Sequence, residues 1–163
     1  MSKNIFVTNA ALYWAVNMPV IPLHSMEKKP IPLGWQKLHD TMPDEKTQTQ
    51  WLKQYPNGNI GLPLGKQSRV VALDIDTTDE SLIRIIEQTL PSSPWIRYGK
   101  KGKVLAYRYT GQKTFRIKAT TGETICELLS EKTQVVLPPS VHPDTKLPYT
   151  ANCNLFDVVD NLL

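Results

Sequence analysis

Two aspartates at alternate positions, Asp74 and Asp76, end the clearest strand signal in the chain, residues 69–76. Side chains alternate along a strand, so residues two apart project from the same face. Two neighbouring carboxylates repel each other unless a positive group joins them, and Mg²⁺ and Mn²⁺ prefer oxygen ligands. The pair therefore indicates a divalent-metal site. The alternative is that one aspartate caps a helix beginning near Asp79 while the other faces water.

A third carboxylate, Glu127, stands alone inside the apolar segment 125–129. Apolar surroundings are costly for a carboxylate without a partner. If this segment pairs with the strand that carries Asp74, Glu127 joins the same metal cluster. Otherwise it is an edge-strand residue that points into solvent.

A block of positive charge separates these acids in the sequence. Eight of the nineteen lysines and arginines lie between residues 97 and 118, where no acidic residue occurs, and 11 basic residues against 15 acidic ones remain elsewhere. Such a block indicates a polyanionic partner, either a nucleotide triphosphate or a nucleic acid, although a solvated lysine-rich hairpin would look the same. Segment 99–103 is no Walker A motif, because it lacks the spacing and precedes a strand. The eight residues are Arg97, Lys100, Lys101, Lys103, Arg108, Lys113, Arg116 and Lys118.

The segment 135–143 runs from an apolar strand into Pro138-Pro139, which fixes the direction of Ser140 and His142. A hydroxyl and an imidazole placed in this way could bind phosphate oxygens. Ser140 has no glycine-rich elbow around it, so a hydrolase triad is not expected.

The elements that must position these residues predict an α+β or mixed α/β domain with helices packed on a central sheet. Helices are expected over 9–16, with Asn9 as a possible cap, from Thr41 to before Pro56, and over 79–90. Strands are expected over 20–23, 69–76, 125–129 and 134–137, with a hairpin formed by 95–98 and 104–109.

The composition fits one folded domain, because 163 residues with 40% hydrophobic and 21% charged residues can bury a core. No apolar stretch is long enough for a bilayer, and no signal-peptide core follows Met1, so a soluble intracellular protein is expected. Cys126 and Cys153 follow no disulfide or zinc spacing and are expected to be reduced.

The order of these features resembles the N-terminal catalytic domain of bifunctional DNA primase-polymerases, within the archaeo-eukaryotic primase superfamily. The resemblance begins with residues 19–22, Lys28-Lys29-Pro30 and Gly34-Trp35, and continues through Asn59-Ile60-Gly61-Leu62. Residues 71–76 are similar to the family's first catalytic motif, and Ile125-Cys126-Glu127 to its third. Residues 138–143 with Pro148-Tyr149 resemble its closing signature.

This resemblance implies a single primase-polymerase catalytic domain over residues 1–163, with an RRM-like catalytic sheet and an N-terminal α/β unit. Asp74, Asp76 and Glu127 would hold two Mg²⁺ or Mn²⁺ ions, without zinc, for nucleotidyl transfer. The NTP or dNTP would bind Arg97, Lys100, Lys101, Lys103, Arg108, Ser140 and His142, and Lys28 and Lys29 would contact nucleotide or template. The partners would be a single-stranded DNA template and a helicase or helical accessory domain, in cytoplasmic plasmid, phage or mobile-element replication.

The chain departs from the family at its second motif, Ser-x-His, since segment 98–104 has no histidine and Lys103 stands in its place. A catalytically weak or inactive nucleic-acid or nucleotide-binding module of the same fold is therefore an alternative. A metal-dependent nuclease is another, because two-metal carboxylate sites also cleave phosphodiesters. The sequence also leaves open whether the chain is a minimal stand-alone protein or the N-terminal part of a longer one.

Overall fold

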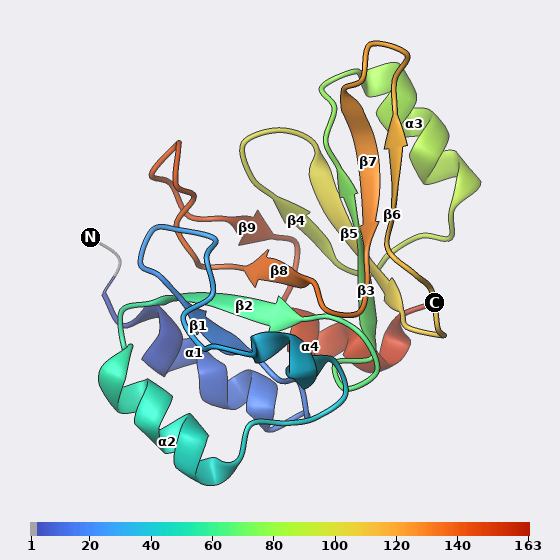
Figure 1. The fold of residues 1–163 in the computed structure, drawn as a ribbon. Helices are drawn as coiled ribbons and strands as arrows, with labels where there is room; N and C mark the ends of the chain where they lie inside the picture. Colours follow the sequence, from blue (N-terminus) through green and yellow to red (C-terminus); the bar gives the residue numbers. More distant parts are fainter. Residues whose placement is uncertain (1–2) are drawn as a thin grey trace.

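The protein is described over residues 3–163 from a computed structural model (Figure 1). Two antiparallel sheets are combined with four α-helices and two short 3₁₀ turns in this part of the chain, which confirms the α+β class. The helical segments are α1 (Ile5–Trp14), η1 (Trp35–His39), α2 (Glu45–Gln54), α3 (Glu80–Thr89), α4 (Leu155–Val158) and η2 (Val159–Asn161).

The larger sheet has six strands in the order β6-β7-β3-β5-β4-β9, and the smaller has the order β1-β2-β8. The chain passes from the large sheet to the small one between β7 and β8, which are consecutive in sequence. The strands are β1 (Ile21–Leu23), β2 (Asn59–Pro63), β3 (Val70–Ile75), β4 (Ile96–Tyr98), β5 (Lys103–Arg108), β6 (Phe115–Lys118), β7 (Thr124–Leu129), β8 (Gln134–Leu137) and β9 (Thr150–Ala151).

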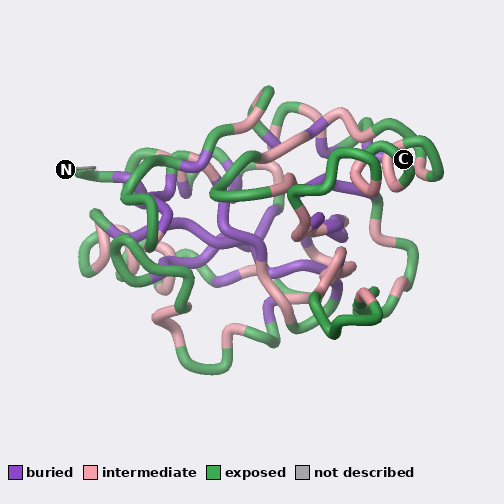
Figure 2. The backbone as a smooth tube through the Cα atoms, turned by 90° about the horizontal axis from the view of Figure 1, so that it is seen from above, coloured by how far each residue is buried: buried purple, intermediate pink, exposed green. Residues whose placement is uncertain are grey.

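The large sheet separates two regions of the core, and Figure 2 shows the buried chain running through the middle of the molecule. On the front face, Val70 and Ala72 of β3 pack with α1 and with both sheets. On the back face, Leu73 and Ile75 of the same strand pack beneath α3. Because β3 is buried on both faces, its continuous apolar run is what the sequence pattern predicts for a central strand.

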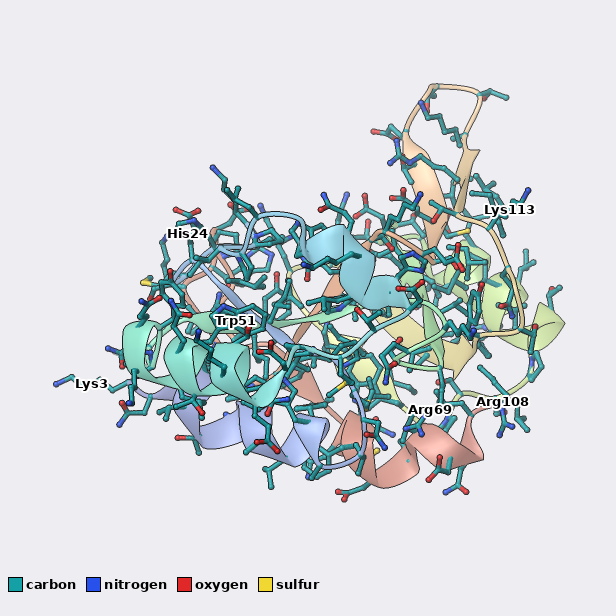
Figure 3. The ribbon with its side chains drawn as sticks, turned by 60° about the horizontal axis from the view of Figure 1, so that its bottom comes forward. Lys3, His24, Trp51, Arg69, Arg108 and Lys113 are labelled. Atoms are coloured by element: carbon teal, nitrogen blue, oxygen red, sulfur yellow. The ribbon has the colours of Figure 1, made fainter. Side chains whose placement is uncertain are left out.

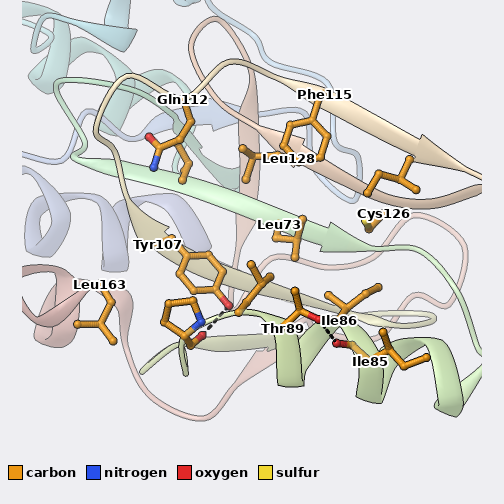
Figure 4. A pocket seen from close by; sticks show the side chains of 14 residues that line it. Leu73, Ile85, Ile86, Thr89, Tyr107, Gln112, Phe115, Cys126, Leu128 and Leu163 are labelled. Atoms are coloured by element: carbon orange, nitrogen blue, oxygen red, sulfur yellow. Dashed lines mark hydrogen bonds between the residues drawn. The ribbon is translucent and has the colours of Figure 1, made fainter.

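An open apolar groove of about 460 Å³ remains on the back face, between α3 and the β6–β7 edge (Figure 4). Leu73, Tyr107, Cys126 and Leu128 form its floor, and Ile86 of α3 lines its side. The Tyr107 hydroxyl donates a hydrogen bond to the Pro91 carbonyl at 3.0 Å. Leu73 and Asp74 are adjacent in β3, so their side chains lie on opposite faces. The groove is therefore on the side of the sheet opposite to Asp74.

Two helix starts differ from the sequence prediction. The first helix begins at Ile5 rather than Asn9, because Ile5 and Phe6 are already buried, and Asn9 lies inside it with its side-chain amide donating to the Ile5 carbonyl at 2.7 Å. The second helix is capped by Asp44 rather than Thr41, since the Asp44 carboxylate accepts from the Thr47 amide at 2.7 Å. Asp79 caps α3 itself, through the amides of Ser81 and Leu82, so neither Asp74 nor Asp76 has this task.

The sequence pattern missed the elements that are short or exposed, above all the edge strand β6, β9 and the C-terminal helix α4. β6 has only four residues, so its alternation of Phe115 and Ile117 with Arg116 and Lys118 is at the lower limit of a recognisable strand pattern. Of the helices between residues 3 and 163, none has the length and apolar character to cross a bilayer.

Candidate active site

Asp74 and Glu127 lie directly opposite each other on the neighbouring strands β3 and β7. Directly opposed residues on antiparallel strands share one face, with β-carbons about 4.5–5.5 Å apart. Asp76 follows β3 by one residue, and its backbone amide donates to the Ile125 carbonyl at 2.8 Å, which continues the pairing. The expected neighbour of the Asp74 strand is therefore present, and the three carboxylates lie along one edge of the front face.

Two of these carboxylates are engaged by cations. Lys101, in the loop between β4 and β5, lies 3.3 Å from Asp76, and Arg116 of β6 lies 2.8 Å from Glu127. Over residues 3–163, no three acidic, histidine or cysteine side chains converge closely enough to form a ready-made metal cage. Both ion pairs are substantially exposed, and such pairs contribute little stability, so a divalent ion can compete with them. The donor set is all oxygen, which fits Mg²⁺ or Mn²⁺.

Asp74 is partly buried on β3, between β5 and β7. Burial raises its pKa above the usual value, and the nearby Arg97 guanidinium acts in the opposite direction. Among the residues described, no hydrogen-bond donor satisfies the Asp74 side chain, so its charge depends on nearby cations. A partly desolvated carboxylate of this kind favours a positive ligand.

Arg97 connects this acid to the closing signature. It lies on β4, its guanidinium carbon is 4.6 Å from the centre of the Tyr149 ring, and it donates to the Val136 carbonyl at 2.8 Å. Burial lowers the pKa of Arg97, and Asp74 partly offsets this effect. The Arg97 Nε and the Tyr149 hydroxyl are buried without hydrogen-bond partners. Two unsatisfied donors next to Asp74 are groups that a bound anion could satisfy.

His142 is buried, and the backbone engages one of its two ring nitrogens. Its Nδ1 accepts from the backbone amides of Asp144 and Thr145, at 3.1 and 3.4 Å, so in the neutral ring the proton is on Nε2. Burial lowers the pKa of His142, and the positive charge of Lys28 contributes to the shift. A neutral Nε2–H is a hydrogen-bond donor suited to a phosphate oxygen.

Two further lysines, Lys28 and Lys100, lie in the same region, and each comes from a loop predicted from the sequence. Lys28 lies close enough to influence the pKa of Asp74 and His142, and Lys100 pairs with Asp144 at 3.1 Å. Together with Lys101, they add exposed positive charge to the buried charge of Arg97. This arrangement is suited to a triphosphate.

Asn59, which the sequence reasoning did not place in the site, fixes two of these loops. Its buried side-chain amide donates to the carbonyls of Glu27 and Val141, and its oxygen accepts from the Val141 amide. It therefore holds the Lys28 loop and the His142 loop in one position. Its only sequence signal was its place in the segment Asn59-Ile60-Gly61-Leu62, which resembles the family's pattern.

Ser140 is buried and serves the same structural purpose. Its hydroxyl accepts from the Ile60 amide at 2.8 Å and is 3.2 Å from the Ile60 carbonyl, to which it donates. Its single hydroxyl proton is engaged by the Ile60 carbonyl, so Ser140 has no free donor for a phosphate oxygen.

Two residues of the basic block lie elsewhere. Lys103 is opposite Ile75 on β5, hence on the back face, where it pairs with Glu87 of α3 at 2.7 Å. Arg108 donates to the carbonyls of Leu162 and Asp160 and lies beside the C-terminal helix (Figure 3). The structure therefore does not bring these two predicted ligands together with the acids. The β5 residue opposite Asp74 is Val104, which is buried.

The remaining candidates are peripheral. Lys29 is exposed, and its carbonyl accepts from the His24 amide. Cys126 and Cys153 are free thiols, the first buried on the back face.

A known protein family matches most of the chain. The family model for the bifunctional DNA primase/polymerase, N-terminal domain matches residues 10–158. The chain belongs to this family. A comparison with curated proteins finds no match.

The match spans all three carboxylates, the basic hairpin and the closing signature. It confirms the resemblance inferred from the sequence motifs. A family of DNA primases and polymerases implies DNA and nucleotides as substrates.

Proposed function

We propose that the chain catalyses metal-dependent, template-directed nucleotidyl transfer, as a DNA primase, a DNA polymerase or both. The observation that carries the proposal is the direct opposition of Asp74 and Glu127, with Asp76 beside them. Asp74, Asp76 and Glu127 would hold the divalent ions. When bound, two such ions lower the pKa of the attacking hydroxyl and stabilise negative charge on the leaving pyrophosphate.

The protein's own groups would bind and orient the triphosphate. Arg97 would offer its unpaired Nε, and His142 its Nε2–H, from positions fixed by the fold. Lys100 and Lys101 would exchange their exposed carboxylate partners for phosphate oxygens, because exposed ion pairs are weak. Lys28 would add charge from the opposite loop.

The structural and biological setting of the proposal follows the family. We propose that the six-stranded sheet is the RRM-like catalytic sheet of the archaeo-eukaryotic primases, and that β1, β2, β8 and α1 form the N-terminal unit. The template would be single-stranded DNA in the cytoplasm, in the replication of a plasmid, phage or mobile element. A helicase or helical accessory domain would act with this domain.

The second candidate is a binding module of the same fold with little or no turnover. Val104 favours it, because this buried apolar residue occupies the β5 position opposite Asp74. A polar ligand from the second family motif would have to reach the acids from that strand position, and Lys103 points to the other face. Triphosphate binding without incorporation would support this candidate.

The test is nucleotide incorporation on a single-stranded template with Mg²⁺ or Mn²⁺, with and without a primer. The Asp74→Asn/Asp76→Asn double variant should abolish the product, whereas Asp79→Asn should retain it, since asparagine caps α3 equally well. Unprimed product would establish priming. Incorporation that persists in the double variant would refute the assignment of the acids.

A further inference from the structure

The edge strand β6 has no role in the site described above, beyond the contact between Arg116 and Glu127. It is the outermost strand of the large sheet and pairs only with β7. All four of its residues are exposed, and Figure 1 shows the β6–β7 hairpin rising above the rest of the sheet. An exposed edge offers unpaired backbone amides in addition to its side chains.

The two faces of β6 differ in chemistry. Arg116 is opposite Glu127, so it lies on the front face with the acids. The pairing shifts register after Ile117, where β7 has one extra residue and Lys118 is opposite Thr124. β6 itself has no extra residue there, so alternation along it places Lys118 on the same side as Arg116. Phe115 is opposite Leu128 and Ile117 is opposite Cys126, so both lie on the back face, where they are about half exposed. One edge thus carries cations on one side and an exposed aromatic ring on the other.

We propose that β6 is the track on which a single-stranded nucleic acid lies as it enters the site, with phosphates on Arg116 and Lys118 and a base against Phe115. A single strand has phosphates along one side and free bases along the other, which matches the two faces of the edge. A duplex has its bases paired inside, and it cannot use Phe115 in this way. Lys113, exposed just before β6, extends the positive charge (Figure 3).

The position of the track relative to the acids supports this partner. The Arg116 guanidinium is 2.8 Å from Glu127, so a phosphate held by Arg116 would lie next to the carboxylate edge. The inference rests on the proposed function only in taking those acids as the catalytic end. Binding to the track itself requires no metal and no triphosphate.

The experiment measures binding of a fluorescein-labelled 20-nucleotide single strand by anisotropy, without metal, over a series of salt concentrations. We expect Lys118→Glu to weaken binding about tenfold and to reduce the salt slope by about 0.7, the value for one phosphate contact on a single strand. Phe115→Ala should weaken binding about tenfold through lost stacking. Unlabelled duplex should compete much less well than the single strand.

Matched controls separate the track from general effects of charge and hydrophobicity. Lys53→Glu removes an exposed lysine on α2, and Leu12→Ala an exposed side chain on α1; both should bind like the wild type. Melting temperatures show that each variant is folded, and Lys118→Gln provides a milder change if the charge reversal unfolds the hairpin.

Several results would overturn the inference. They are an absence of single-strand binding by the wild type, unchanged affinity in folded Lys118→Glu and Phe115→Ala, or equal competition by duplex. Unchanged affinity with increased aggregation would show that the β6 charges only protect the sheet edge. If these variants bind normally while the wild type incorporates nucleotides, the track fails and the proposed function stands. If binding depends on the track but the wild type does not incorporate nucleotides, the track stands and the proposed function fails.

Discussion

Glu127 on β7 faces Asp74 on β3 across one antiparallel pair, while their neighbours Cys126 and Ile75 face the opposite side of the sheet. This register, rather than closeness in sequence, brings together carboxylates that are 53 positions apart. The contribution of each acid to catalysis can be tested by neutralising it and comparing the result with the same substitution at an acid outside the site.

Asp74→Asn and Glu127→Gln should each lower the rate of incorporation by about 10²–10³-fold, because each removes a charge that stabilises the transition state. Single-turnover incorporation at saturating Mn²⁺ measures the effect. Asp79→Asn and Glu123→Gln are matched controls and should stay near the wild-type rate. Equal losses in a control and its site variant would argue against a special role for the pair.

Arg116→Gln should tighten Mn²⁺ binding about two- to fivefold in the absence of DNA, because an exposed ion pair no longer competes for Glu127. Titration of the Mn²⁺ electron paramagnetic resonance signal measures this affinity. Lys118→Gln keeps the Arg116–Glu127 pair and should leave the Mn²⁺ affinity unchanged. Weaker Mn²⁺ binding in Arg116→Gln would mean that Arg116 orients the carboxylate rather than competing for it.

Lys101→Gln should weaken triphosphate binding about tenfold, whereas Lys103→Gln should change it less than about twofold. The first lysine lies beside Asp76 on the front face, and the second pairs with Glu87 on the back face. The difference reflects the loss of a charge-assisted hydrogen bond to phosphate. Fluorescence titration with a labelled nucleotide measures it, and the reverse order of effects would contradict the placement of Lys103.

The contribution of His142 to stability should depend on pH. Its folded-state pKa is lowered, and protonation would also break the two hydrogen bonds that Nδ1 accepts. The contribution is therefore fully present above the unfolded-state pKa of about 6.5 and is lost as pH falls toward the lower folded value.

Urea unfolding of the wild type and His142→Gln at pH 7.5 and pH 5 tests this expectation. The two proteins should differ by about 1–2 kcal/mol at the higher pH, the value of the backbone hydrogen bonds, and by less at the lower one. A difference that grows on acidification would mean that the charged ring is the stabilising form.

The sequence was most informative where burial and chemistry occur together. The buried strand β3, its two aspartates and the isolated Glu127 could be predicted because a carboxylate in an apolar run needs a partner. The sequence did not determine which residues of β5 lie on the same face as the acids, because a register shift of one residue moves every side chain to the other face of the sheet. For that reason Lys103 was expected beside the acids and instead pairs with Glu87.

Other residues could not be assigned because their roles depend on long-range contacts. Asn59 bonds Val141, which is 82 positions away, and Arg108 bonds Leu162, which is 54 positions away. Neither residue has a local pattern that indicates its partner. The exposed strand β6 was missed for a different reason, since its alternating pattern extends over only four residues.

A ligand in the groove behind β3 could change the position of Asp74 on the front face without binding there. Leu73, in the groove floor, immediately precedes Asp74 in the same strand, so a compound wedged beneath α3 would press on the backbone that sets the position of the carboxylate. Such a compound would need no phosphate mimic and no charge. An inhibitor of this class would act by displacing a strand, and it would discriminate among relatives by the shape of the apolar groove rather than by their shared acids.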